Sequence, residues 1–295
     1  MNIRELLAEG KRLLSIPCAS AYIDSPALDA MLLLSQALGL RREEIILREN
    51  EVPDKGDKEK FFRLITRRKE GECIAYILGR KEFRGLDFTV NHNVLVPRPD
   101  TETLIEAALE YIDTIQKNTK TTDGKGLSIL DLCTGSGALA VSLKSERPFL
   151  QLSASDISAE ALEIAAFNAK KHLGSVKNIR FIHSNLFESI RKKFNIILSN
   201  PPYIASGEIS LLAPEVRREP RLALDGGIDG LELIRKIITQ APDYLQKNGV
   251  LLLEADLQQM QEIKTLLEKN NFTGISIHKD LAGKNRVISA ANSLL

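Results

Sequence analysis

From residue 128 to the C-terminus, short apolar runs alternate with longer amphipathic segments. The apolar runs predict β-strands because they are short, rich in Ile, Leu and Val, and bounded by turn-forming residues. The predicted strands are Ser128–Leu132, Leu150–Ser155, Ile179–His183, Phe194–Ser199, Val250–Glu254, Gly274–Lys279 and Arg286–Ala290. The predicted helices between them include Ala159–Lys171, Gly230–Leu245 and Leu257–Asn270. Such alternation is typical of an α/β fold with a mostly parallel, doubly wound sheet and right-handed crossovers.

The first part of the chain, residues 1–75, has the periodicity of helices. Apolar residues recur at helical spacing over Ile3–Leu14. A second helix is predicted to begin after Ser25, its N-cap, and to end at Gly39. A third, highly charged helix is predicted over Lys58–Glu70. These segments predict a small helical bundle in which no residue has the character of a catalytic group.

Between the helical part and the alternating part, the apolar period changes toward two. Residues 76–96 contain turn residues at Gly85 and at 91–93, which predicts a β-hairpin linker. A helix is predicted to begin near Thr101, and the polar stretch 117–126 predicts a mobile loop. The resulting division is a helical domain over 1–75, a hairpin linker over 76–96 and an α/β catalytic domain over 97–295.

Composition narrows the functional classes. The 295-residue chain is 43% hydrophobic and 27% charged, as expected of a globular protein with a sizeable core. Its formal net charge of +1 gives no argument for nonspecific nucleic-acid binding. Three cysteines without a CxxC pair predict neither a disulfide framework nor a zinc ribbon, and they fit a reducing compartment. Four scattered histidines predict no metal site. Without an apolar signal core or membrane-spanning run, we expect a cytoplasmic protein with no membrane partner.

The turn after the fourth predicted strand, Asn200-Pro201-Pro202-Tyr203, points to methylation of a planar nitrogen. An amide or aniline-like nitrogen is a poor nucleophile because its lone pair is delocalised. The Asn200 side-chain oxygen and the Pro201 carbonyl can each accept one N–H, which would fix the nitrogen and stabilise its growing positive charge. The prolines stiffen the turn, and the Tyr203 ring can pack on a flat group. The alternative interpretation is an ordinary proline-rich turn after a strand.

A glycine-rich segment, Asp131–Ala140, follows the first predicted strand. Its glycines permit a tight turn and close approach of a ligand to the backbone. The N–H groups at the start of the next helix favour an anionic group such as a carboxylate or phosphate. Gly135-Ser136-Gly137 alone is weak support, because it can also be a simple helix-entry turn.

Asp156 ends the second predicted strand, where an acid can accept hydrogen bonds from both hydroxyls of a ribose. It can also cap the next helix, although Ser158 is better placed to do so. The loop and this acid together fit either NAD or S-adenosyl-L-methionine. Asn200 favours the latter, because hydride transfer has no use for two acceptors at a nitrogen whereas methyl transfer does.

At these motifs the chain resembles the protein-(glutamine-N5) methyltransferases of release factors, the HemK-like class I family. The resemblance covers nearly the whole chain and is most specific in Val94–Glu102, Glu215–Leu231 and Asp280–Val287. It implies a Rossmann-like class I methyltransferase with a mostly parallel seven-stranded sheet, a helical substrate-recognition domain and a β-hairpin linker. It also implies transfer of a methyl group from S-adenosyl-L-methionine to the side-chain N5 of the Gly-Gly-Gln glutamine in class-1 peptide chain release factors. S-adenosyl-L-homocysteine would be the product.

The resemblance also implies a role for each site residue. Asn200 and Pro201 would hold the glutamine amide, with Pro202 and Tyr203 beside it, and Asn200, Pro201 and Tyr203 would be catalytic. The residues implied to bind the cofactor are Arg98, Thr101, Cys133, Thr134, Gly135, Ser136, Gly137, Asp156, Leu186 and Asn200.

The chain departs from the usual family pattern at several of these positions. Cys133 stands where Gly is common, Asn185 where Asp is common and Leu186 where an aromatic residue is common. Glu254-Ala-Asp replaces the more usual Glu-x-Gly after the fifth strand. We expect these changes to affect cofactor affinity and to leave the reaction type unchanged.

Three other functions compete with this interpretation. A glutamine of a ribosomal protein could be the acceptor, by the same chemistry. A nucleic-acid adenine-N6 methyltransferase shares the Asn-Pro-Pro-Tyr turn, and Arg217, Arg218 and Arg221 favour it. The small net charge and the absence of Trp argue against it, so we expect no stable nucleic-acid binding. A noncatalytic cofactor-binding module is disfavoured because Asn200 and Tyr203 are both present.

Overall fold

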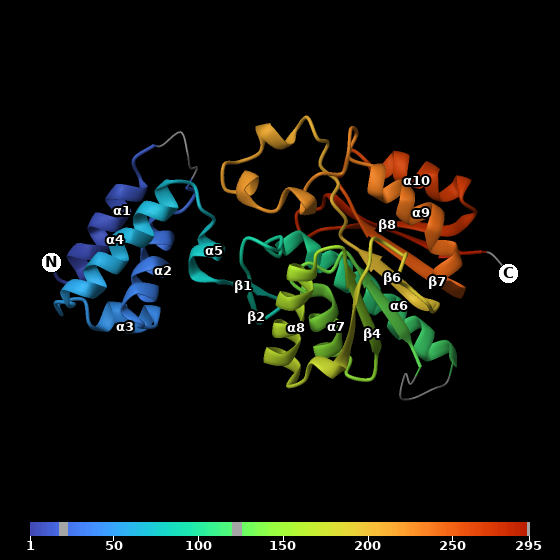
Figure 1. The fold of residues 1–295 in the computed structure, drawn as a ribbon, viewed down its shortest axis with the longest axis horizontal. Helices are drawn as coiled ribbons and strands as arrows, with labels where there is room; N and C mark the ends of the chain where they lie inside the picture. Colours follow the sequence, from blue (N-terminus) through green and yellow to red (C-terminus); the bar gives the residue numbers. More distant parts are fainter. Residues whose placement is uncertain (18–22, 120–125, 294–295) are drawn as a thin grey trace. The chain divides into compact units, whose positions relative to one another are not determined.

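The structure, a computed structural model, describes residues 1–17, 23–119 and 126–293. The chain forms two compact units (Figure 1). Unit 1 comprises Met1–Arg80 together with Ser210–Glu219, and unit 2 comprises Lys81–Ile209 together with Pro220–Leu295. The inclusion of Ser210–Glu219 in the helical unit was not predicted from the sequence.

Unit 1 is a helical bundle around its own apolar core, which includes Leu6, Leu33 and Phe61. Its helices are α1 (Ile3–Leu14), α2 (Pro26–Leu38), α3 (Arg42–Leu47), α4 (Lys55–Lys69) and α5 (Ile74–Leu78). The three predicted helices are therefore present, and two short ones, α3 and α5, were missed. α2 ends at Gly39 as predicted, and Gly39 has the left-handed conformation, whereas the Ser25 side chain makes no capping hydrogen bond.

The predicted hairpin is shorter than its sequence pattern suggested. It consists of β1 (Arg80–Phe83) and β2 (Leu86–Thr89), joined by a turn in which Arg84 and Gly85 both have positive φ. The chain leaves the strand after Thr89, so the predicted second turn at 91–93 belongs to the connection toward the next helix.

Unit 2 is built on a seven-stranded sheet with the order β5-β4-β3-β6-β7-β9-β8. β9 pairs antiparallel with both of its neighbours, and the other pairs are parallel. The strands are β3 (Ser128–Leu132), β4 (Gln151–Asp156), β5 (Ile179–His183), β6 (Phe194–Ser199), β7 (Leu245–Glu254), β8 (Phe272–Lys279) and β9 (Asn285–Asn292). The predicted mostly parallel, Rossmann-like sheet is confirmed, and every predicted strand is present.

Helices cover both faces of this sheet (Figure 1). Ile129 of β3 lies in the core shared with α6, α7 and α8, whereas the next residue, Leu130, lies in the core shared with α9 and α10. The helices are α6 (Glu102–Thr119), α7 (Ala138–Glu146), α8 (Ala159–Leu173), α9 (Glu232–Tyr244) and α10 (Met260–Lys269). The predicted loop 117–126 is wrong at its start, since α6 extends to Thr119, and residues 120–125 lie outside the described residues.

The sheet brings the predicted site motifs to one edge. Leu132 at the end of β3 is in register with Ser155 of β4 and with Ser199 of β6. The strand order reverses between β3 and β6, because the chain passes from β3 to β4 on one side and reaches β6 on the other. Ligands bind at such a switch point, outside the carboxyl ends of the strands. Within the described ranges, no helix is both long and apolar enough to span a membrane.

Candidate active site

Asn200, directly after β6, meets a residue from a distant part of the chain. Its side-chain Nδ2 donates a hydrogen bond to Thr101 Oγ1 over 3.2 Å. Thr101 is buried at the end of the 3₁₀ turn Pro99–Thr101, which leads into α6. The contact joins the Pro-Arg-Pro-Asp-Thr-Glu segment to the Asn-Pro-Pro-Tyr turn, so these two motifs form one site.

The Tyr203 side chain reaches Glu254 at the end of β7. Its hydroxyl donates to Glu254 Oε1 over 3.4 Å, and burial raises the pKa of the Tyr203 phenol. Glu254 is almost fully buried, and this burial raises its pKa to about 7. Glu254 was not predicted to be a site residue, although a charged residue closing an otherwise apolar strand was a sign that could have identified it.

The backbone of the Asn200 turn is held by the segment Leu224–Leu231. Ile204 N donates to Leu224 O over 3.0 Å, and Gly226 N donates to Ile204 O over 2.8 Å. A Cβ on Gly226 would lie 2.8 Å from the Pro202 carbonyl oxygen. A Cβ on Gly230 would overlap the Tyr203 carbonyl oxygen and lie 2.7 Å from Gln259 Nε2. Only glycine allows this close backbone approach.

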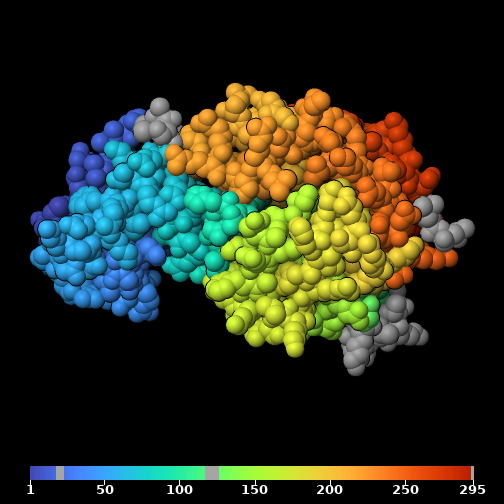
Figure 2. Space-filling view, viewed as in Figure 1, coloured from blue at the N-terminus to red at the C-terminus, as the bar shows by residue number. Residues whose placement is uncertain are grey.

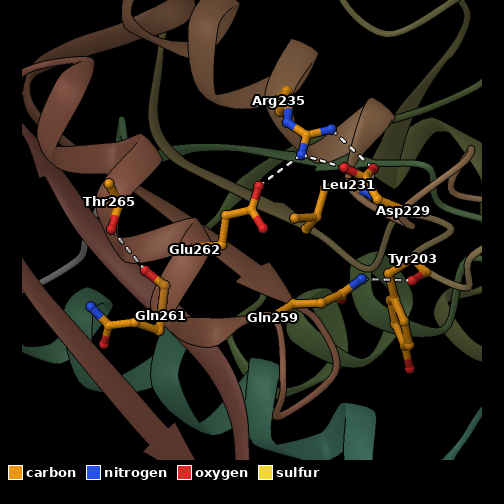
Figure 3. Close-up of polar contacts among 8 residues, drawn as sticks. All are labelled: Tyr203, Asp229, Leu231, Arg235, Gln259, Gln261, Glu262 and Thr265. Atoms are coloured by element: carbon orange, nitrogen blue, oxygen red, sulfur yellow. Dashed lines mark hydrogen bonds and ion pairs between the residues drawn. The ribbon is translucent and has the colours of Figure 1, made fainter.

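A second set of polar contacts fixes that segment to α9 and α10 (Figure 3). Gln259, at the start of α10, donates from Nε2 to the Tyr203 carbonyl over 2.9 Å. Arg235 of α9 pairs with Asp229 and, over 2.7 Å, with Glu262 of α10. The Arg235 guanidinium, as the main cause, lowers the pKa of Asp229 to about 2. The turn therefore rests on a rigid support that sequence analysis did not identify.

The glycine-rich loop is shaped from inside by a buried acid. Asp131 Oδ2 accepts from Thr134 Oγ1 over 2.6 Å and from Ala140 N over 3.1 Å. Burial raises the pKa of Asp131 to about 7. Cys133 has a φ of 63°, a left-handed conformation that costs a non-glycine residue about 1–2 kcal/mol. Glycine would adopt this backbone conformation without that cost.

Asp156 links the glycine-rich loop to the second strand of the site. Its Oδ2 accepts from Gly135 N over 2.8 Å, and its Oδ1 accepts from Ser158 N over 2.9 Å. Burial, the largest effect, raises the pKa of Asp156 although these hydrogen bonds lower it. Ser158 caps α8 by accepting from Ala161 N, as the sequence predicted. Each Asp156 oxygen keeps a further lone pair for a ligand hydroxyl.

A cavity of about 370 Å³ lies over this edge of the sheet, within the usual size of a small-molecule site. In the space-filling view, the orange surface around residues 220–240 borders the yellow-green surface around residues 155–190, and both segments contribute to the cavity wall (Figure 2). The predicted site residues that line it are Arg98, Thr101, Cys133, Thr134, Gly135, Ser136, Asp156, Leu186, Asn200 and Pro202. Gly137, Pro201 and Tyr203 do not line it.

The cavity has the chemistry that S-adenosylmethionine requires. A Cβ built on Gly135 meets nothing within 4 Å, so the space above the loop is open to a ligand. Asp156 offers acceptors for hydroxyls beside the apolar side chains of Ile157 and Leu186, which suit a flat ring. Among the described residues, no group of three or more side chains is arranged to hold a metal ion.

Comparison with known proteins identifies the family. Residues 5–79 match the family model of the PrmC N-terminal domain, and residues 108–216 match the methyltransferase small domain. A release factor glutamine methyltransferase of Burkholderia pseudomallei is 39% identical over 265 residues, covering 88% of this chain and 90% of that protein. One from Agrobacterium fabrum is 36% identical over 287 residues, covering 97% and 95%. The chain belongs to the release factor glutamine methyltransferase family.

Membership of the release factor glutamine methyltransferase family confirms the resemblance found in the motifs. It also confirms the predicted enzyme class, an S-adenosylmethionine-dependent methyltransferase. A solved structure of the hMettl16 catalytic domain with an RNA hairpin is similar at a TM-score of 0.55 and covers 81% of each chain. At 11% identity, that likeness shows the shared fold alone.

Proposed function

We propose that this chain transfers the methyl group of S-adenosyl-L-methionine to the side-chain N5 of the Gly-Gly-Gln glutamine in class-1 release factors. The observation that carries the proposal is that Asn200 and the glycine-rich loop line a single cavity. The printed names of the relatives support a release factor as the acceptor protein. We further propose that the helical residues 1–75 help to dock that protein, and that residues 97–295 perform the reaction.

When bound, the cofactor supplies a methyl group on a positively charged sulfur, and the chain supplies position. The glycine-rich loop, from Thr134 to Gly137, would cradle its amino-acid end by close approach of the backbone. The N–H groups of Thr134, Gly135 and Gly137 already donate to Ser155, Asp156 and Thr134, so Ser136 would supply the backbone N–H. Asp156 would accept hydrogen bonds from the ribose hydroxyls, and Leu186 would border the base. Arg98 lines the same wall. The apolar parts of the cavity exclude water from the reacting atoms.

Asn200 and Pro201 would act on the acceptor nitrogen. The Asn200 Oδ1 and the Pro201 carbonyl would each accept one N–H of the glutamine amide, which directs its lone pair toward the methyl group. The nitrogen–carbon bond forms as the carbon–sulfur bond breaks, and that bonding pair stays on sulfur. The two acceptors stabilise the charge on nitrogen, which loses its proton to bulk water as the methylated product leaves the cavity. No strong base is required, because the nitrogen becomes acidic once it is positively charged.

The arginines that favour a nucleic-acid substrate are partly engaged within the protein. Arg218 donates to the Glu70 carbonyl, and Arg221 pairs with Asp225 over 2.9 Å. Pairing with the Asp225 carboxylate leaves Arg221 less charge to offer to phosphates, whereas the carbonyl partner of Arg218 fixes that side chain without neutralising it. These contacts weaken the case for adenine methylation.

Methyl incorporation from labelled S-adenosylmethionine tests the proposal. The acceptors, assayed in parallel, are a purified class-1 release factor, its Gly-Gly-Gln→Gly-Gly-Ala variant and duplex DNA. We expect label on the wild-type factor alone. Label on the Gly-Gly-Ala variant would show that methylation occurs at another residue of the release factor. Label on DNA alone would overturn the proposal.

Two variants separate the proposed roles. Asn200→Ala should lose turnover by about 100-fold or more while cofactor Kd stays within about twofold, because the lost acceptor acts on the substrate nitrogen. Asp156→Ala should raise the cofactor Kd. The control is Asn178→Ala, because the Asn178 side chain bonds only an exposed backbone carbonyl in the described structure. This variant should match the wild type in turnover and in cofactor Kd. A large loss of cofactor binding in Asn200→Ala would contradict its assigned role.

A further inference from the structure

A series of three polar side chains, those of Asn200, Thr101 and Glu254, lies behind the proposed site. Asn200 Nδ2 donates to Thr101 Oγ1 over 3.2 Å, and the Thr101 hydroxyl lies beside the Glu254 carboxyl, where it lowers the pKa of that carboxyl. Thr101 is 5% exposed and Glu254 is 1% exposed, so water does not compete for these contacts. The three residues come from separate segments: the turn after β6, the 3₁₀ turn before α6 and the end of β7.

The direction of hydrogen-bond donation along this series is set by the hydroxyl proton of Thr101. The Thr101 hydroxyl has a single hydrogen, which can point to Glu254 or to Asn200 but not to both. An ionised carboxylate only accepts hydrogen bonds, so ionised Glu254 takes the Thr101 proton. The lone pairs of Thr101 then face Asn200 and accept from its NH₂ group.

That arrangement decides which end of the Asn200 amide faces the substrate. The oxygen and nitrogen of a carboxamide lie on opposite sides of Cγ, so binding Nδ2 to Thr101 turns Oδ1 away from it. We propose that Thr101 and Glu254 are positioning residues that orient the Asn200 carboxamide, so that Oδ1 is presented to the N–H of the acceptor amide. The inference rests on the proposed function of Asn200 as an acceptor for that N–H.

Protonation of Glu254 reverses the direction of hydrogen-bond donation along this series. A protonated carboxyl donates to Thr101, whose own hydrogen then points to Asn200. The Asn200 amide flips to accept it, and its NH₂ group faces the NH₂ of the substrate. Two donors then oppose each other, and the acceptor nitrogen is no longer held.

The surroundings place this reversal near neutral pH. Glu254 faces the Tyr203 hydroxyl and the Arg286 guanidinium, with Asp100 nearby, and among the described residues its Oε2 has no hydrogen-bond partner. Arg286 is shared with Asp100 over 2.8 Å and Asp280 over 3.5 Å, so it only partly compensates Glu254. Burial dominates and raises the pKa of Glu254 to about 7.

Steady-state kinetics with the release factor test the positioning role. We expect Thr101→Val to lower kcat by about 100-fold, with release-factor KM and cofactor Kd within about twofold of wild type. Thr101→Ser keeps the hydroxyl and should restore most of the activity. Wild-type kcat should rise with a midpoint near pH 7, and Glu254→Gln should be slow with no such midpoint. Thr265→Val and Glu268→Gln, both on α10 and outside the cavity lining, are matched controls.

A second measurement does not depend on the substrate. The side-chain amide of Asn200 is followed by NMR in the ¹⁵N-asparagine-labelled protein and assigned by its loss from Asn200→Ser. It should titrate with a midpoint near pH 7 in wild type and Thr101→Ser, and not in Thr101→Val or Glu254→Gln. A resonance that ignores pH in wild type, or titrates unchanged in Thr101→Val, would overturn the inference. If the titration is found but no release factor is methylated, the proposed function fails and the positioning role stands.

Discussion

Two acidic residues of this site, Asp131 and Asp156, hold groups of the protein itself. Asp131 bonds Thr134 and Ala140 within the glycine-rich loop, and Asp156 bonds the backbone of Gly135 and Ser158. Each carboxylate thereby satisfies N–H or O–H groups that would otherwise be orphaned beneath the cavity. The cost is desolvation, and it raises the pKa of both acids.

Asp131 should make stability depend on pH. Its pKa is raised to about 7 in the folded state, so between about pH 4 and 7 the folded state binds the extra proton and stability falls as pH rises. Above about pH 7 Asp131 is ionised in both the folded and the unfolded state, so its contribution to stability no longer changes with pH. Asp131→Asn removes this titration. In denaturant unfolding, the free energy of unfolding of Asp131→Asn minus that of the wild type should therefore increase by a few kcal/mol between pH 4 and 7 and then stay constant. A difference that is flat with pH would contradict the assignment.

Gly230 offers a test of the support beneath the Asn200 turn. Gly230→Ala should abolish most turnover, because the new Cβ displaces the Tyr203 carbonyl and Gln259. Gly174→Ala is the matched control: its φ of +74° is close to the +75° of Gly230, but nothing lies within 4 Å of the new Cβ. Both variants should lose about 1 kcal/mol of stability from the left-handed backbone. Equal turnover in the two would show that the turn tolerates displacement.

At the level of secondary-structure elements, the strands were the most predictable part. The β6 strand Phe194–Ser199 and the β3 strand Ser128–Leu132 were predicted with their observed limits, because strands buried on both faces form continuous apolar runs. The short helices α3 and α5 were missed, since about one helical turn gives too few residues to show a period.

Within the site, prediction succeeded for local motifs and failed for contacts between distant segments. The glycine-rich loop, Asp156 and Asn200 could be placed because each follows a strand whose carboxyl end lies on one edge. The pairing of Thr101 with Asn200 and the approach of Gly230 to Tyr203 join separate segments. No periodicity in the sequence reports such pairings, which depend on how the loops pack.

The segment Ser210–Glu219 is held to the helices of its unit by an ion triad centred on the buried Arg68. Arg68 of α4 pairs with Asp29 over 2.7 Å and with Glu215 over 2.6 Å, and its side chain is 5% exposed. Burial raises the pKa of Asp29 even though Arg68 opposes this. Removing one partner of a buried pair leaves an uncompensated charge, which commonly costs 3–5 kcal/mol.

Arg68→Met should therefore destabilise the helical unit by about 3 kcal/mol in denaturant unfolding. The matched control is Arg235→Met, which also loses two acidic partners but at a site 38% exposed, and should cost about 1 kcal/mol or less. Adding Asp29→Leu to Arg68→Met should recover much of the loss, because the stranded carboxylate is gone. Equal losses for the two arginine variants would contradict the burial argument.

At the scale of the whole molecule, each unit has an apolar core of its own. The helical unit is centred on residues such as Phe61, and the sheet unit has one core on each face. The cavity is lined entirely by residues of the sheet unit. A ligand in that cavity should therefore act mainly on the stability of the sheet unit.

Hydrogen exchange with and without S-adenosylhomocysteine checks this expectation. At 100 times its Kd, the ligand should stabilise the protein that binds it by about 2.7 kcal/mol. We expect added protection in the glycine-rich loop, β4 and the Asn200 turn, and little change in α1 to α4. Protection that is as large in α1 to α4 as around the cavity would contradict it.

The chain passes from one unit to the other three times, after Arg80, Ile209 and Glu219. A single cut near residue 80 therefore does not release a self-contained catalytic domain. The truncated protein would retain a ten-residue excursion, Ser210–Glu219, whose Glu215 has lost Arg68. A minimal catalytic domain needs two edits, removal of the N-terminal helices and replacement of that excursion by a short polar linker. The two segments of unit 1, Met1–Arg80 and Ser210–Glu219, are best exchanged together when domains are swapped between relatives.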